Sequence, residues 1–115
     1  YATYLKFIER ARSDMLRSAG IDQRAVLEDK KGVYVVAEAR IKYKKPAKLD
    51  DALLVLSEVK EVRAASCVIH QRVMRESELL ADAMITAAFL SSEGRPKRQP
   101  PAWMEIFERL KKEGS

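Results

Sequence analysis

The sequence has few of the residues that form disulfides or bind metal ions, and no long apolar segment that could span a membrane. It holds one cysteine, one histidine and no apolar run long enough to span a bilayer as a helix. Cys67 alone excludes an intrachain disulfide, and its apolar surroundings favour a small buried thiol. A spanning helix needs about 20 apolar residues, and no signal peptide is visible. We therefore expect a cytoplasmic protein with no membrane span.

The remaining composition is that of one folded domain. The chain has 115 residues, of which 47% are hydrophobic and 34% charged, which is ordinary for a globular protein and too apolar for a disordered one. This length suits a single core, so we expect one domain over 1–115. The formal net charge of +5 favours partners that carry phosphate: nucleic acid, anionic lipid or a nucleotide-like cofactor. A nucleic-acid module would rest on this charge alone, since its basic clusters lack interleaved aromatic residues.

Apolar spacing predicts a long helix, four strands and a short last helix. Spacings of three and four from Tyr4 to Met15 predict an amphipathic helix over 3–19, which Gly20 ends. Period-two alternation predicts strands over 33–43, 53–62, 67–75 and 79–90, the last three as an antiparallel meander. The expected buried faces are Ala37, Ala39, Ile41 and Tyr43 in the first strand, and Leu79, Ala81, Ala83, Ile85, Ala87 and Phe89 in the last.

The fold class expected from this order is α+β, with the long helix packed on the sheet. A terminal helix is expected around Trp103, Ile106, Phe107 and Leu110, after a loop rich in proline. Trp103 and Phe107 are interpreted as packing anchors of that helix rather than as part of an acyl pocket.

Five stretches in order resemble one family: YATYLKFIERAR (1–12), LRSAGI (16–21), YKKPAKLDD (43–51), LLADA (79–83) and GRPKRQP (94–100). Together they resemble the 4-hydroxybenzoyl-CoA thioesterase class of hotdog proteins, and within it the Tol-Pal-associated acyl-CoA thioesterases of the YbgC family. The resemblance implies a hotdog fold, homodimers that often pair into homotetramers, and active sites at the dimer interface. It implies hydrolysis of an acyl thioester of coenzyme A or acyl carrier protein, with no cofactor and no metal.

The family pattern begins with Asp-x-x-Gly-Val-Val-Tyr-His-x-x-Tyr on a strand that runs into the helix. Tyr1 falls at the His of that pattern, so the resemblance places the first strand and its Asp about seven residues upstream, outside this sequence. Unsatisfied N–H groups at a helix start can stabilise the charge on a thioester carbonyl oxygen. We therefore expect the Tyr1 amide as an oxyanion donor, with the upstream Asp as nucleophile or general base.

The resemblance also nominates substrate-binding residues. Tyr4 matches the last Tyr of the pattern, and Arg63 and Ser66 lie on a strand connection that in relatives approaches the coenzyme A nucleotide. Lys97 and Arg98 lie in a loop that could reach its phosphates. For each basic residue a solvated surface position is the alternative.

Other ionisable residues are weaker candidates for a catalytic role. His70 is the only histidine, and nothing at metal-ligand or triad spacing accompanies it. Glu38 and Glu58 are expected on the strand surface, and Glu9 is the better candidate for a catalytic Glu of the alternative hotdog arrangement. An alternative function is a hotdog protein that binds acyl thioesters or a protein partner without turnover, since a fold does not fix an activity.

Overall fold

The computed structural model describes residues 2–21, 32–48 and 51–113, with the side chains of Ala2 and Thr3 left out. Along the chain come α1 (Ala2–Ser18), β1 (Val33–Tyr43), β2 (Leu54–Val62), β3 (Ser66–Arg75), β4 (Glu78–Leu90) and α3 (Pro101–Glu113). The strands form an antiparallel sheet in the order β1-β4-β3-β2, which contains the expected meander of β2, β3 and β4. The predicted α+β class is confirmed.

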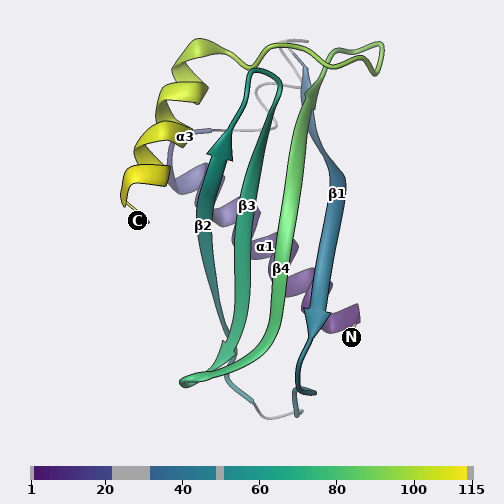
Figure 1. The fold of residues 1–115 in the computed structure, drawn as a ribbon, viewed down its shortest axis with the longest axis vertical. Helices are drawn as coiled ribbons and strands as arrows, with labels where there is room; N and C mark the ends of the chain where they lie inside the picture. The colour runs from purple at the N-terminus through teal and green to yellow at the C-terminus, as the bar shows by residue number, and fades with distance from the viewer. Residues whose placement is uncertain (1, 22–31, 49–50, 114–115) are drawn as a thin grey trace.

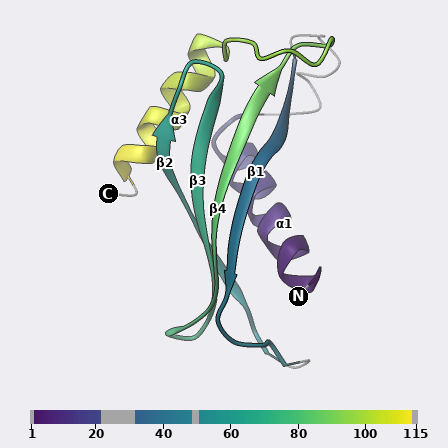
Figure 2. The same ribbon diagram turned by 45° about the vertical axis from the view of Figure 1, so that its right-hand side comes forward.

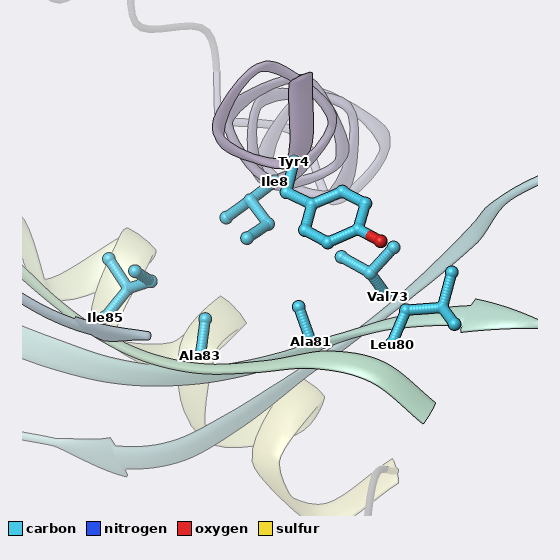
Figure 3. Close-up of a cluster of buried hydrophobic side chains, with 7 residues drawn as sticks. All are labelled: Tyr4, Ile8, Val73, Leu80, Ala81, Ala83 and Ile85. Atoms are coloured by element: carbon cyan, nitrogen blue, oxygen red, sulfur yellow. The ribbon is translucent and has the colours of Figure 1, made fainter. Parts of the chain in front are cut away.

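One face of the sheet carries the core, and α1 crosses that face diagonally (Figure 1). Figure 3 shows Tyr4 and Ile8 of α1 pointing toward Val73 and toward Leu80, Ala81, Ala83 and Ile85 of β4. A second cluster joins Leu16 and Ile21 to Ile69, Ala87 and Phe107. The helix α3 lies beside β2 (Figures 1 and 2), and Phe107 anchors it as expected. No helix in the described ranges is long and apolar enough to cross a membrane.

The predicted buried face of β1 was wrong, and that of β4 was confirmed at every position but Leu79. Ala37, Ala39 and Tyr43 of β1 are exposed, and only Ile41 is partly buried. The reason is that β1 is an edge strand with a bulge between Val36 and Glu38, which the alternation of its residues cannot reveal. In β4 the buried position belongs to Leu80 rather than Leu79, because the register with β3 shifts there.

We expect Gly32→Ala to destabilise the protein more than Gly94→Ala. Both glycines have positive φ, +147° and +82°, which an alanine adopts at a cost of about 1–2 kcal/mol. A Cβ on Gly32 would also lie 2.6 Å from the Leu90 carbonyl oxygen and 2.6 Å from Cζ of Phe89, whereas nothing lies within 4 Å at Gly94. Urea denaturation should give a loss of about 3 kcal/mol for Gly32→Ala and about 1 kcal/mol for Gly94→Ala. Equal losses would contradict the close approach at Gly32.

Candidate active site

The first turn of α1 is one end of the candidate site. Its N–H groups have no intrahelical acceptors, and the positive end of the helix dipole lies behind them. This turn carries no acidic residue, so no carboxylate of its own competes with an incoming oxyanion for these donors. Tyr1, the expected donor, lies outside the described residues, and its role stays a prediction.

Tyr4 fastens this end of α1 to the sheet. Its side chain is 2% exposed, and its hydroxyl donates a hydrogen bond of 2.7 Å to the Lys45 carbonyl oxygen. Its ring stacks on that of Tyr43 at a centroid distance of 6.0 Å. The structure therefore gives Tyr4 a positioning contact, and its predicted contact with substrate stays a prediction.

Ion pairs hold the segment after β1 in place beside Tyr4. Lys45 Nζ lies 2.6 Å from Glu78, Glu78 pairs with Arg75, and Arg75 lies 2.5 Å from Asp51. Asp51 also accepts a bond of 2.6 Å from the Lys48 amide. The pKa of Asp51 is lowered mainly by this backbone bond. The pKa of Glu78 is lowered mainly by its hydrogen bond from Lys45. The network lies beside the carbonyl to which Tyr4 is bonded, and the amides of Lys44 and Lys45 tie that segment to the Leu80 carbonyl oxygen.

The predicted coenzyme A residues gather at the other end of the sheet, where β2 and β3 are joined. The Arg63 amide donates a bond of 2.8 Å to the Ser66 carbonyl oxygen. Gln99, 1% exposed, donates from Nε2 to the carbonyl oxygens of Arg63 at 2.8 Å and Ser66 at 3.0 Å. This clamp brings the loop with Lys97 and Arg98 onto the turn, and both of those side chains are exposed.

Sequence reasoning missed Gln99, because a glutamine among prolines gives no signal of burial. It also missed that the Glu61 carboxylate neutralises the Arg63 guanidinium, which donates two hydrogen bonds of 2.9 Å to it. These bonds are the main cause that raises the pKa of Arg63. A surface pair of this kind partly satisfies the guanidinium before any ligand arrives.

The two ends do not converge within one chain. Ser66 pairs with Ala88, whereas Val73, which packs under Tyr4, pairs with Ala81. A separation of seven residues along a strand corresponds to roughly 23 Å. A single chain therefore holds the two halves of the predicted site far apart.

His70 has a partner that the sequence did not reveal. Its Nε2 contacts the Asp82 carboxylate across β3 and β4. Because Ile69 and Gln71 are buried under α1, the alternating His70 lies on the opposite face of the sheet. The pair thus lies on the wrong face to act at the first turn of α1. Within the described ranges no three His, Cys, Asp or Glu side chains are grouped to hold a metal ion.

A cavity of about 90 Å³ lies between α1, the sheet and α3. Arg12, Tyr34 and Cys67 are its ionisable wall residues. Burial lowers the pKa of Arg12 and raises that of Tyr34. Burial also raises the pKa of the Cys67 thiol to about 11, although Arg12 acts in the opposite direction. The expected buried thiol is confirmed.

A family model of the thioesterase superfamily matches residues 1–82 of the sequence. The chain belongs to the thioesterase superfamily. An acyl-CoA thioesterase of the YbgC family from Haemophilus influenzae is 37% identical over 96% of this chain and 82% of its own length. The long-chain acyl-CoA thioesterase FadM of Escherichia coli is 33% identical over 74% of this chain and 64% of its own.

A solved thioesterase structure is similar to this chain in fold. A 1,4-dihydroxy-2-naphthoyl-CoA thioesterase from Synechocystis superposes with a TM-score of 0.87 over 96% of this chain and 82% of its own, at 18% identity. A likeness at that identity speaks for the fold alone. With the family match it confirms the predicted hotdog fold of this thioesterase-superfamily chain.

We expect Cys67 to react slowly with a disulfide reagent while the chain is folded. The rise of its pKa from 9.0 to about 11 leaves about 100-fold less thiolate at pH 8. The raised pKa also stabilises the fold fully below pH 9, and that contribution is lost as the pH rises through 11. Absorbance kinetics at pH 8 should show a reaction at least about 100-fold slower than in urea. Similar rates with and without urea would contradict the burial of the thiol.

Proposed function

We propose that this protein hydrolyses acyl-CoA thioesters to a free acid and coenzyme A. The observation that carries the proposal is the 37% identity over 96% of the chain to an acyl-CoA thioesterase. It acts in the cytoplasm and needs no metal or redox cofactor. Acyl carrier protein is the alternative carrier of the acyl group, and its thioester would be hydrolysed in the same way.

The first turn of α1 supports the chemistry of this proposal. Attack on a thioester builds negative charge on the carbonyl oxygen, and fixed N–H donors stabilise that charge more in the transition state than in the substrate. The Tyr1 amide is the proposed donor. A carboxylate ahead of the helix either attacks the carbonyl carbon or takes a proton from a water that does. In both routes the C–S bond breaks, and coenzyme A leaves as a thiol once its sulfur is protonated. In the first route this leaves the acyl group on the carboxylate as a mixed anhydride, which a water then hydrolyses to the free acid; in the second route the attacking water gives the free acid directly.

The separation of the two ends supports a site shared by two chains. The edge strand β1 exposes Val35, Val36 and Tyr43, and α1 exposes Leu5 and Phe7. Edge strands with exposed apolar residues are sites of strand pairing. If two β1 strands pair antiparallel about a two-fold axis, the first turn of one α1 comes to the end of the sheet where its partner carries Lys97. We propose this homodimer as the active unit, and pairing of dimers into a tetramer as a further level.

Charge supports the placement of the nucleotide in this arrangement. Lys97, Arg98 and Arg63 lie on the segments that meet at one end of the sheet. Cations at this place suit the phosphates of coenzyme A, and Arg side chains suit them best because of their forked donors. Since Glu61 already engages Arg63, we propose that Arg98 contributes more than Arg63 does.

A thiol-release assay over a series of acyl chain lengths tests the proposal. We expect the triple variant Arg63→Ala, Lys97→Ala, Arg98→Ala to raise KM about tenfold, which corresponds to about 1.4 kcal/mol of lost binding. Its kcat should stay within about twofold, because these groups lie far from the reacting carbonyl. The KM of the wild type should rise with salt, and that of the triple variant should respond less.

The matched control is Lys60→Ala, Arg109→Ala, Lys112→Ala, which removes the same charge elsewhere and should leave KM unchanged. Acyl-CoA that binds but releases no thiol at any chain length would favour the non-catalytic alternative. An unaltered KM in the first triple variant would refute the assignment of the nucleotide site.

A further inference from the structure

Arg12 is a half-buried cation in the wall of the cavity between α1, the sheet and α3, where apolar side chains face it. Leu16, Ile69, Ala87 and Phe107 form apolar walls, and the exposed Val36 lies at the rim. The Arg12 guanidinium lines the cavity from the middle of α1. The proposed oxyanion site lies about two helical turns closer to the start of the same helix. A charged group in such surroundings is costly unless it is paired.

Gln71 fixes the position of the guanidinium. It is 0% exposed, and its Nε2 donates to the Ile8 carbonyl oxygen at 3.0 Å and to Ser57 Oγ at 2.9 Å. With both N–H bonds used, Oε1 is presented to Arg12, whose Nη1 donates to it at 3.0 Å. The amide therefore cannot turn without losing buried bonds, and it holds Arg12 against the cavity.

Most of the donors of Arg12 remain available. A guanidinium has five N–H donors and no acceptor, and the bond to Gln71 uses one. Over the described part of the chain Arg12 makes no ion pair; Glu9 acts on its pKa from one turn away without contacting it. Burial lowers the pKa of Arg12, and the other ionisable wall residues, Tyr34 and Cys67, are held neutral by burial. The cavity thus presents a fixed positive charge with no anion in its wall.

We propose that this cavity binds a carboxylate carried on a short alkyl stem. The forked guanidinium matches a carboxylate, and the pairing is strongest where water is excluded. The apolar walls accept the stem. An apolar cavity of about 150 Å³ takes a ligand the size of benzene, so the 90 Å³ here takes a smaller group, such as the last two or three carbons of an acid.

This carboxylate has two sources, and both rest on the proposed thioesterase function. It can be the far end of a dicarboxylic acyl group whose thioester lies at the first turn of α1 in the partner chain, or it can be a free acid such as the product. The first source makes Arg12 a residue that selects the acyl group. The second makes the cavity a product site.

Binding can be tested without any thioester. Propionate should shift the NMR signal of the Ala87 methyl group in the wild type at constant ionic strength, whereas the neutral propionamide should not. Arg12→Met should weaken propionate binding at least tenfold, and Ala87→Val should weaken it by filling the cavity while leaving Arg12 intact. The control Arg10→Met removes the same charge from the exposed face of α1 and should bind as the wild type does.

Hydrolysis separates the two sources. A wild-type preference for succinyl-CoA over butyryl-CoA of at least tenfold in kcat/KM, lost in Arg12→Met, assigns the acyl end. Inhibition by propionate without such a preference, lost in the same variant, assigns the free acid. Propionate that fails to bind the folded wild type, or binds Arg12→Met equally well, overturns the proposal. Propionate binding without thiol release from an acyl-CoA of any chain length would refute the proposed function and leave the carboxylate site standing.

Discussion

The contact of Gln71 with α1 is the interaction on which the arrangement of the molecule depends. Its Nε2 donates to the Ile8 carbonyl oxygen and its Oε1 accepts from Arg12, both on α1, while its second N–H bond goes to Ser57 on the neighbouring strand β2. A buried amide left unpaired costs about 1–3 kcal/mol, so sliding α1 along the sheet would forfeit both bonds to the helix at once. The helix is therefore fixed in register, and its first turn and Arg12 are fixed with it. Its first turn reaches Lys45 through Tyr4, and Arg12 reaches the cavity.

This register has a consequence for activity. The first turn of α1 lies at one end of the sheet, and the basic turn and loop lie at the other, roughly 23 Å away. Under the proposed mechanism, a single chain can offer either an oxyanion site or a nucleotide site to one thioester. An antiparallel pairing of two chains joins one of each, and it also covers the apolar groups that β1 leaves exposed. The proposed dimer thus follows from two independent features of the chain.

Local sequence patterns predicted most of the fold. The strands end within one residue of their predicted limits, and α1 within one residue of its own, because alternation and helical spacing are read from neighbours along the chain. The buried face of β1 was wrong, since edge position and a bulge depend on the order of strands in the sheet. The pairing of His70 with Asp82 was missed for a similar reason, as it depends on the register of two strands.

The site was less accessible from sequence than the fold. Arg63, Ser66, Lys97 and Arg98 came from family resemblance, and the structure groups their segments at one end of the sheet through Gln99. The roles of Gln71, Gln99 and Arg12 could not be predicted, because a polar residue in an amphipathic pattern looks solvated until its partners are known. Tyr1 lies outside the described residues, so its part in catalysis stays a prediction.

Complementation between two defective chains tests the shared site most directly. One chain carries Tyr1→Pro, which removes the proposed donor and keeps a residue suited to a helix start; it includes the residues that precede Tyr1 in the family pattern. The other carries Arg63→Ala, Lys97→Ala and Arg98→Ala. Random pairing of equal amounts makes half of the dimers mixed, each with one intact site, so activity at low substrate should recover to about a quarter of the wild type. Activity that stays at the average of the two separate variants would contradict a site built from two chains.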